Sequence, residues 1–256
     1  MHVTQHTVLG HPTRVQVGGD GPALVFLHGQ ALTWEWTTIH DELATQFTVY
    51  APIHPGFGGE DIPKWLDDVH DMTFHNAALI NELGLDQPLV AGVSLGGWLA
   101  LDLAVHRPDL VGAVLAVGAL GLRPQSPMPD LFIKHAPEAL GYLANTFDTA
   151  PYDALTGDVD AATDLWVEQA TQARLMWERP YDPRLARRLE LVACPSTVLW
   201  GGGDRLLPPE HGRRLAELMG ADFDVAPESG HMVTADAPGA VVAAASRLHQ
   251  RRKDIS

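Results

Sequence analysis

The chain has 256 residues, 46% of them hydrophobic and 19% charged, which is typical of a globular protein that buries a full core. The net charge is −15, from 32 acidic and 17 basic residues, and it disfavours a nucleic acid partner. A single cysteine, Cys194, excludes an intrachain disulfide framework. Without a signal-peptide core or an apolar run of roughly 18 residues, a soluble, cytoplasmic protein with no membrane partner is expected. The sequence leaves the oligomeric state open.

Strand and helix patterns alternate through most of the chain. Val15 and Val17 alternate with polar neighbours up to a Gly/Pro turn, which predicts a first strand. Short continuous apolar runs, typical of strands buried on both faces of a parallel sheet, follow at 23–27, 47–51, 88–93, 111–117 and 195–200, and a last strand is expected at 223–226. Helical patterns lie at 36–43, 69–83, 95–105, 210–219 and 237–248. This alternation predicts an α/β fold with a doubly wound, mostly parallel sheet.

The alternation breaks between residues 122 and 191. This stretch contains no convincing strand, and several prolines interrupt it. Helical patterns lie within it at 137–147, 159–177 and 183–191. We interpret it as a helical lid inserted into a core domain formed by residues 1–121 and 192–256.

The segment Gly92-Val93-Ser94-Leu95-Gly96 joins a predicted strand to a predicted helix. A G-x-S-x-G sequence in this context is typical of a sharp turn that exposes a nucleophilic serine hydroxyl. Glycines are needed two residues before and after Ser94, because a Cβ atom there would collide with neighbouring backbone. The sequence therefore predicts Ser94 as a catalytic nucleophile.

Leu27-His28-Gly29-Gln30 follows an early buried strand and is expected to lie beside this turn. The backbone N–H groups of Gln30 and Leu95 are the predicted oxyanion hole. His28 is an alternative general base, but a structural role in bracing the loop is favoured because a better candidate lies downstream.

That candidate is His231, in Ser229-Gly230-His231-Met232, which lies between the last predicted strand and the last helix. Asp204 follows another buried strand on a glycine-rich turn, from which its carboxylate can orient a histidine. The order Ser94, Asp204, His231 is the one expected for this kind of serine turn. These three residues are the predicted catalytic triad.

Taken together, these motifs resemble the α/β-hydrolase superfamily. The resemblance rests on Leu27-His28-Gly29, His54-Pro55-Gly56-Phe57-Gly58, Gly92-Val93-Ser94-Leu95-Gly96-Gly97, Trp200-Gly201-Gly202-Gly203-Asp204-Arg205 and Gly230-His231. It implies an eight-stranded sheet, a lid after the sixth strand, and hydrolysis through a covalent acyl-enzyme that needs neither metal nor cofactor.

Within that superfamily, segments 174–177 and 180–185 are similar to the lid region of meta-cleavage-product hydrolases, which break carbon–carbon bonds. Those enzymes usually carry Asn before the nucleophile and Trp after the histidine, where this chain has Val93 and Met232. Haloalkane dehalogenases and epoxide hydrolases use an aspartate nucleophile, so Ser94 disfavours both.

We expect an ester or lactone hydrolase acting on a small acyl substrate that is neutral or weakly polar. Carbon–carbon bond hydrolysis, acyl transfer, and a catalytically silent receptor on the same fold remain alternatives. Large apolar side chains of the lid and its surroundings are candidates for the substrate pocket: Trp34, Trp98, Leu131, Phe132, Leu143, Phe147, Leu165, Trp166, Met176 and Trp177.

Overall fold

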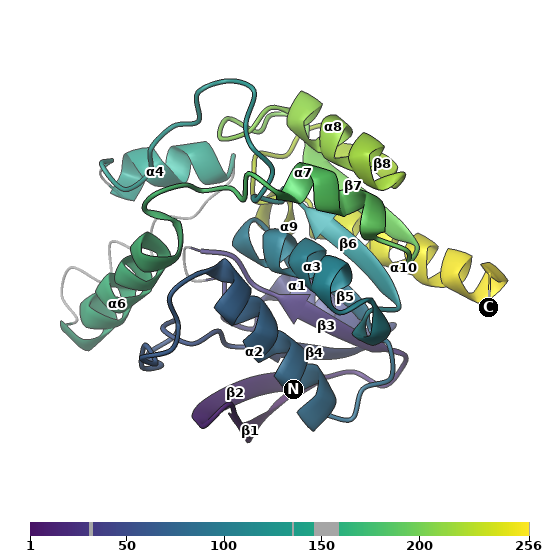
Figure 1. The fold of residues 1–256 in the computed structure, drawn as a ribbon, viewed down its shortest axis with the longest axis horizontal. Coiled ribbons are helices and arrows are strands. Elements are labelled where there is room, and N and C mark those ends of the chain that lie inside the picture. Colours follow the sequence, from purple (N-terminus) through teal and green to yellow (C-terminus); the bar gives the residue numbers. More distant parts are fainter. Residues whose placement is uncertain (31–32, 135, 146–158, 256) are drawn as a thin grey trace.

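The computed structural model describes residues 1–30, 33–134, 136–145 and 159–255 (Figure 1). It contains an eight-stranded sheet with the strand order β1-β2-β4-β3-β5-β6-β7-β8. β2 pairs antiparallel with β1 and β4, and all other neighbouring strands are parallel. The strands are β1 (His2–Val8), β2 (His11–Gly18), β3 (Ala23–Leu27), β4 (Thr48–Pro52), β5 (Leu89–Val93), β6 (Ala113–Val117), β7 (Ser196–Gly201) and β8 (Asp222–Ala226). The predicted α/β class with a mostly parallel sheet is confirmed.

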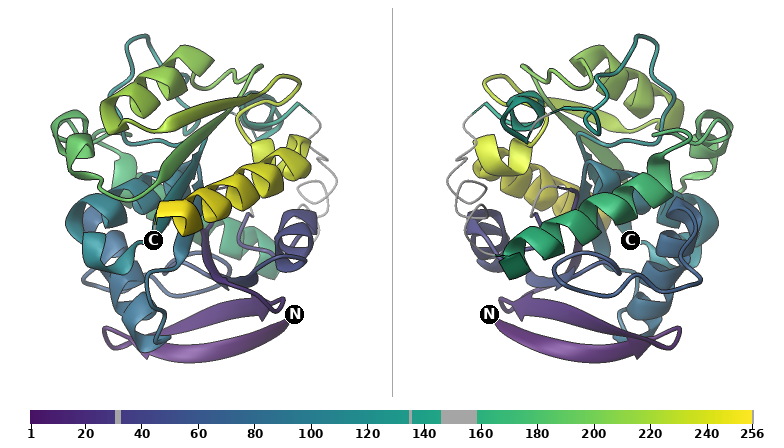
Figure 2. Two further views of the ribbon diagram at one scale, coloured as in Figure 1. Left: turned by 90° about the vertical axis from the view of Figure 1, so that its right-hand side faces the viewer. Right: turned by 90° about the vertical axis from the view of Figure 1, so that its left-hand side faces the viewer.

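Helices cover both faces of the sheet. α1 and α10 pack on one face, and α2, α3 and α8 pack on the other (Figures 1 and 2). The helices are α1 (Thr38–Ala44), α2 (Val69–Glu82), α3 (Leu95–His106), α4 (Ala136–Leu143), α6 (Val159–Met176), α7 (Leu185–Arg188), α8 (Pro209–Met219), α9 (Val233–Asp236) and α10 (Pro238–Ile255), with short 3₁₀ turns η1 (Pro108–Leu110) and η2 (Leu189–Leu191). Within the described residues, no helix is long and apolar enough to cross a membrane.

Local sequence explains where several helices begin and end. The Asp68 side chain accepts the backbone N–H of Asp71 and so caps the first turn of α2. Helix α8 begins with Pro209, whose missing N–H would have no partner in a first turn. It ends at Gly220, whose φ of +64° is in the left-handed region that glycine adopts without strain.

β1 is the strand that the sequence does not predict. It lies at the edge of the sheet, and all of its residues but Val8 are exposed or only half-buried. An edge strand that is wet on both faces needs no apolar alternation, so its sequence carries no strand pattern. The backbone pairing of β1 with β2, from His2↔Val17 to Val8↔His11, is what makes it a strand.

The sheet topology creates a natural position for a site. β3 lies at the centre, and the chain passes from β3 to β4 on one side and then to β5 on the other. Ligands of open α/β sheets bind where the strand order reverses, at the carboxyl ends of the strands. The segment between β6 and β7 carries α4, α6 and α7. Helices α4 and α6 project beyond the sheet at the left of Figure 1.

Candidate active site

Ser94 occupies the turn between β5 and α3 in a strained backbone conformation. Its φ is +55° and its ψ is −114°, which residues with a Cβ atom rarely adopt. Its N–H donates to the Val117 carbonyl at 2.9 Å, and its own carbonyl accepts the N–H groups of Trp98 and Leu120, each at 3.1 Å. These three bonds hold the strained turn in place.

The glycines on either side of Ser94 are required by close packing. A Cβ added to Gly92 would lie 2.1 Å from the Gly96 carbonyl oxygen, and one added to Gly96 would lie 2.0 Å from that of Leu27. Both distances are far inside van der Waals contact, so β5, α3 and the end of β3 can approach this closely only without those side chains.

The structure brings Ser94, His231 and Asp204 together from the turns that follow β5, β8 and β7. His231 Nε2 lies 3.0 Å from Ser94 Oγ, and His231 Nδ1 lies 2.8 Å from Asp204 Oδ2. The second carboxylate oxygen, Oδ1, accepts the N–H groups of Leu206 and Leu207 at 2.8 and 2.9 Å. Since a carboxylate can only accept, Nδ1 of the neutral imidazole carries the proton and Nε2 faces the hydroxyl as an acceptor.

The residues around His231 fix its loop. The Gly203 N–H donates to the Ser229 carbonyl at 2.8 Å, and the Gly230 N–H donates to Asp236 Oδ2 at 2.7 Å. The Met232 N–H donates to the Leu143 carbonyl at 2.6 Å, which links the histidine loop to the end of α4. Ser94 and His231 are both fully buried, so their hydrogen bond is shielded from water.

His28 has a different environment. Its Nδ1 lies 2.8 Å from the Gly29 carbonyl oxygen, and its Nε2 accepts the His54 N–H at 2.9 Å. Burial lowers the pKa of His28 to about 3, so the ring is neutral at pH 7. Both ring nitrogens are occupied in linking the loop after β3 to the loop after β4, which accords with the structural role expected for His28.

The predicted oxyanion-hole residues flank Ser94. Leu95 is the first residue of α3, where backbone N–H groups have no carbonyl partner one turn earlier. Gln30 lies on the loop after β3. A Cβ added to Gly29 on that loop would lie 3.2 Å from Ser94 Cβ, so the loop runs directly beside the serine.

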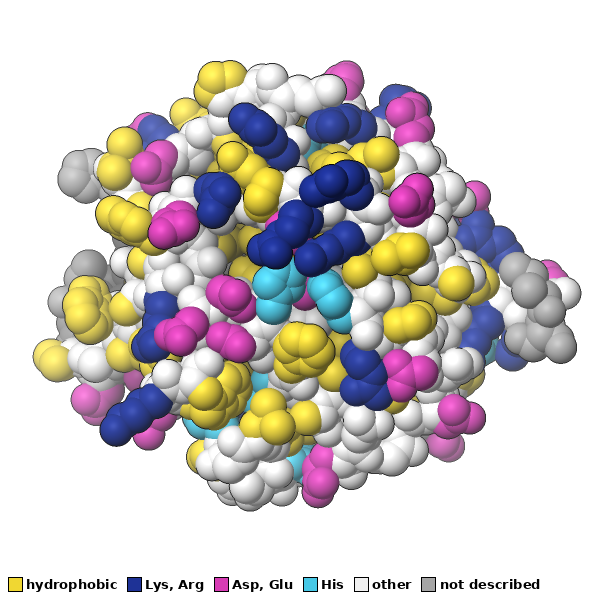
Figure 3. Space-filling model, in the orientation of Figure 1, with side chains coloured by type: hydrophobic (Ala, Val, Ile, Leu, Met, Phe, Trp, Pro, Cys, Tyr) yellow, Lys and Arg dark blue, Asp and Glu magenta, His cyan; other side chains and the backbone are white. Residues whose placement is uncertain are grey.

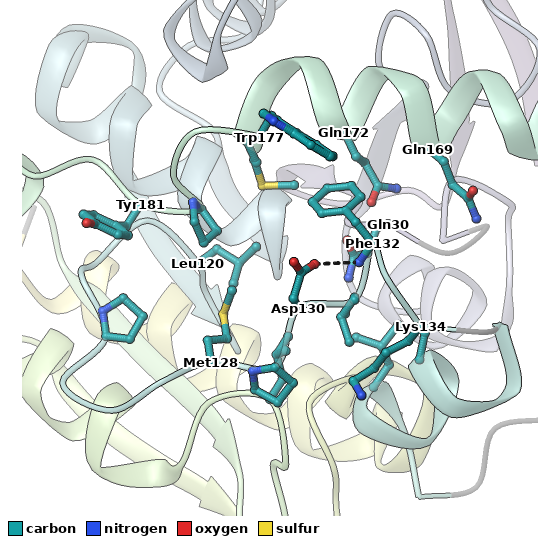
Figure 4. A pocket seen from close by; sticks show the side chains of 18 of the residues that line it. Gln30, Leu120, Met128, Asp130, Phe132, Lys134, Gln169, Gln172, Trp177 and Tyr181 are labelled. Atoms are coloured by element: carbon teal, nitrogen blue, oxygen red, sulfur yellow. Dashed lines mark hydrogen bonds between the residues drawn. The ribbon is translucent and has the colours of Figure 1, made fainter.

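A cavity of about 480 Å³ adjoins these residues (Figure 4). Gln30, Leu120 and Leu206 are part of its wall, and the last two donate their N–H groups to the Ser94 carbonyl and to Asp204. The cavity wall is thus hydrogen-bonded to the backbone of Ser94 and to the carboxylate of Asp204. Its opposite wall comes from the segment between β6 and β7.

Six of the ten candidate pocket residues line this cavity: Leu131, Phe132, Leu143, Leu165, Met176 and Trp177. Trp34 packs against Gly58 and Trp98 against Gly121, outside the lining. Trp166 also lies outside it and is 69% exposed, because it follows Leu165 and points about 100° away around α6. Phe147 lies outside the described residues.

The residues predicted from the sequence are all apolar, whereas the cavity wall also contains polar side chains. Asp130, Glu168, Gln169 and Gln172 line it, and Figure 4 shows Asp130, Gln169 and Gln172 around it. A signal for two of them exists in the sequence: Glu168, Gln172 and Met176 follow at four-residue steps and so share one face of α6.

A second cluster of titratable groups lies on the outer side of α2 and α3. His70 Nδ1 is 2.7 Å from Asp102 Oδ2, and His106 Nδ1 is 3.2 Å from Asp102 Oδ1. The hydrogen bond to Asp102 is the main cause of the raised pKa of His70. In the part of the chain that is described, these three side chains are the one group close enough to share a metal ion.

An arginine next to this cluster contributes a positive charge that pairs with a nearby acid. Arg188 lies 3.2 Å from Asp182 and 3.4 Å from His106 Nε2. Figure 3 shows histidine side chains next to a group of basic ones on this face. With a guanidinium already against His106, the arrangement is better described as an ion-pair network than as a cation site.

Comparison with known proteins identifies the family. The sequence profile of the alpha/beta hydrolase family matches residues 24–245. A 2-hydroxy-6-oxo-6-phenylhexa-2,4-dienoate hydrolase of Burkholderia cepacia is 27% identical over 83% of this chain and 82% of its own length. The chain therefore belongs to the alpha/beta hydrolase family, as its motifs indicate.

Solved structures share the fold. A thermophilic esterase from Thermogutta terrifontis superposes with a TM-score of 0.77 and 21% identity, over 98% of this chain and 99% of the esterase. The enol-lactonase from Burkholderia xenovorans LB400 superposes equally well, at 0.77 with 17% identity, over 96% of this chain and all of the lactonase (100%). These similarities establish a common fold, and one fold can support several different reactions.

Proposed function

We propose that this protein is a serine hydrolase that cleaves a carboxylic ester or lactone through an acyl-enzyme. The observation that carries the proposal is the buried chain of hydrogen bonds from Asp204 through His231 to Ser94, at the carboxyl ends of the strands and beside a cavity. An acid, a base and a hydroxyl in this order are the parts needed for acyl transfer to serine.

The proposed reaction begins when Ser94 Oγ attacks the ester carbonyl carbon. His231 Nε2 takes the hydroxyl proton, and Asp204 stabilises the imidazolium that forms. The backbone N–H groups of Gln30 and Leu95 donate to the oxyanion of the tetrahedral intermediate. His231 then gives its proton to the leaving alcohol. A water molecule, activated by the same imidazole, hydrolyses the acyl-enzyme and returns the hydroxyl to Ser94.

The segment from 122 to 191 is the proposed lid. Its residues supply most of the cavity wall, and the Met232 N–H bond to the Leu143 carbonyl ties α4 to the histidine loop. A lid in this position limits the access of bulk water to the bound substrate while Ser94 attacks it.

The test is hydrolysis of p-nitrophenyl esters of increasing chain length by the wild-type protein and by Ser94→Ala. Loss of a serine nucleophile costs several orders of magnitude in rate, roughly 10⁶ in one serine hydrolase. We expect turnover by the wild type and at least a 10³-fold loss in the variant, with an unchanged melting temperature. Equal activity in both proteins would contradict the proposal.

Carbon–carbon bond hydrolysis is the second candidate, because the Burkholderia cepacia relative is named for a dienoate substrate. The same triad would serve that reaction. Val93 and Met232 stand where Asn and Trp are usual in that group, which favours ester cleavage. Parallel assays with a coloured dienoate and with an ester distinguish the two reactions by their kcat/KM values.

A further inference from the structure

The cavity beside Ser94 contains two acidic side chains. Asp130 is exposed, and its Oδ1 accepts the Phe132 N–H at 2.9 Å. Glu168 lines the same cavity from α6 but is only 1% exposed, and its Oε1 lies 3.4 Å from Gln172 Nε2. The exposed Asp130 carboxylate can contact a ligand directly, whereas Glu168 is part of the buried wall.

The basic side chains of the cavity wall are already engaged. Lys134 forms an ion pair with Glu138 one turn further on, and its Nζ lies 5.0 Å from the centroid of the Tyr142 ring. The Arg123 guanidinium lies 5.7 Å from the centroid of the Tyr181 ring. Neither cation therefore offers a ready partner for an anionic substrate, and binding a carboxylate would have to displace these contacts.

Two aromatic rings line the same cavity, and one of them belongs to Phe132, whose N–H bonds to Asp130. The centroids of Phe132 and Trp177 are 6.0 Å apart, with the ring planes at 53°. Both side chains line the cavity and remain open to a ligand, with 41% and 72% of their surface exposed. Figure 4 shows Asp130, Phe132 and Trp177 as neighbours along one side of the cavity. Aromatic faces beside a carboxylate are the combination that binds quaternary ammonium groups.

We propose that this cavity binds a substrate arm carrying an ammonium group, with Asp130, Phe132 and Trp177 as its contacts. The preferred substrates are then cationic esters. This inference rests on the proposed ester hydrolysis and names its substrate class. The net charge of −15 acts in the same direction, because it attracts cations and repels anions at long range.

The arrangement accounts for both ends of such a substrate. The ester carbonyl lies at Ser94, between Gln30 and Leu95, and the arm extends past Leu120 to Asp130. A neutral ester would fill the same space without the charge interactions. An anionic ester would face the Asp130 carboxylate, so it is expected to be the poorest substrate.

The first experiment compares three butyrate esters that differ in one group of the alcohol. Choline butyrate carries a trimethylammonium group, 3,3-dimethylbutyl butyrate is its neutral isostere, and 2-carboxyethyl butyrate carries an anion on the same two-carbon spacer. We expect kcat/KM for the choline ester to exceed that of the neutral isostere about tenfold, and the anionic ester to be slowest. Asp130→Asn and Trp177→Ala should each reduce the ratio of kcat/KM for the cationic ester to kcat/KM for the neutral ester at least threefold.

Asp224→Asn is the matched control, because Asp224 is an acid on β8 paired with Arg247, away from the cavity. It should leave the ratio unchanged. A wild-type ratio near one, or a faster anionic ester, would overturn the inference while leaving ester hydrolysis intact. Absence of all ester turnover would instead contradict the proposed function.

A binding measurement tests the cation site without turnover. Titration calorimetry with phenyltrimethylammonium should show saturable binding to the wild type, and at least threefold weaker binding to Asp130→Asn and to Trp177→Ala. Phenylacetate, an anion of similar size, should bind more weakly than the cation. If phenyltrimethylammonium does not bind, or if both variants bind it as well as the wild type, the inference is wrong.

Discussion

Replacing Asp204 with Asn separates the role of its charge from that of its shape. In the structure, Oδ1 accepts two backbone N–H groups, from Leu206 and Leu207, and Oδ2 accepts the His231 Nδ1–H. The asparagine oxygen must stay with the two backbone donors, so its NH₂ group faces Nδ1. Nδ1 then becomes an acceptor, and the proton moves to Nε2, where it faces Ser94 instead of accepting from it.

The expected loss in kcat follows from the two N–H donors that face each other in the variant. To act as a base, His231 must return to the tautomer with Nδ1–H, which sets two donors against each other in a fully buried site. Leaving a buried donor unsatisfied costs about 1–3 kcal/mol, so two cost about 4 kcal/mol together. At about 1.4 kcal/mol per tenfold change in rate, kcat should fall about 10³-fold. Loss of the charge that stabilises the imidazolium makes this a minimum.

The assay is kcat on a p-nitrophenyl ester at pH 7, with the melting temperature measured in parallel. The fold should be little affected, because the amide keeps both backbone hydrogen bonds, and Asp224→Asn controls for the loss of one acidic charge. A fall of less than tenfold in kcat, with the fold intact, would refute the assignment of Asp204 as the group that orients His231.

Three further predictions concern the fold and its pH dependence. Gly96→Ala should lower the free energy of unfolding by about 3 kcal/mol or more in urea titrations, because its Cβ would lie 2.0 Å from the Leu27 carbonyl oxygen. Gly239→Ala is the control: a Cβ at this position meets open space, so the variant should not destabilise the protein. Burial lowers the pKa of His28 to about 3 and those of His40, His75 and His211 to about 4. Below pH 6.5 the unfolded chain therefore binds protons that the folded chain does not. The free energy of unfolding should fall by up to about 1.4 kcal/mol per pH unit for each histidine until pH 4. Urea titrations between pH 7.5 and 4.5 that show no decrease in this free energy would contradict the prediction. The raised pKa of His70 has the opposite effect: the stabilisation by His70 is complete below pH 6.5 and is lost as the pH rises through its folded-state pKa. His70→Gln should therefore lower the melting temperature more at pH 6 than at pH 9. An equal change at both pH values would refute the ion pair with Asp102.

The sequence predicts the site elements well where the chemistry is local. The Ser94 turn needs glycines at fixed positions, because close backbone contacts forbid a Cβ, and that requirement is visible in the sequence. The order of Ser94, Asp204 and His231 is also predictable, since Ser94 and Asp204 each follow a buried strand and His231 follows the last predicted strand. The structure adds the distances that join them, 3.0 and 2.8 Å, which no sequence pattern contains.

Other features depend on contacts with residues far along the chain, and the sequence does not predict them. β1 is a strand because its backbone pairs with β2, and since both faces of β1 are largely exposed to solvent, its sequence has no alternating apolar pattern. The predicted cavity residues are all apolar; they include Trp166, which points away from the cavity, and they do not include Asp130 or Glu168. Which face of α6 meets the core is decided by tertiary packing, for example by the Thr171 hydroxyl bond to the Gly56 carbonyl at 3.0 Å.

The most direct test of the mechanism is the mass of the protein during turnover. Rapid acid quench of wild-type protein mixed with excess p-nitrophenyl butyrate, followed by mass spectrometry of its peptides, should reveal a butyryl group on the peptide that contains Ser94. Ser94→Ala should carry no such adduct and should release p-nitrophenol at least 10³-fold more slowly than the wild type. Turnover by Ser94→Ala at the wild-type rate, or an adduct on another residue in the wild type, would contradict the account.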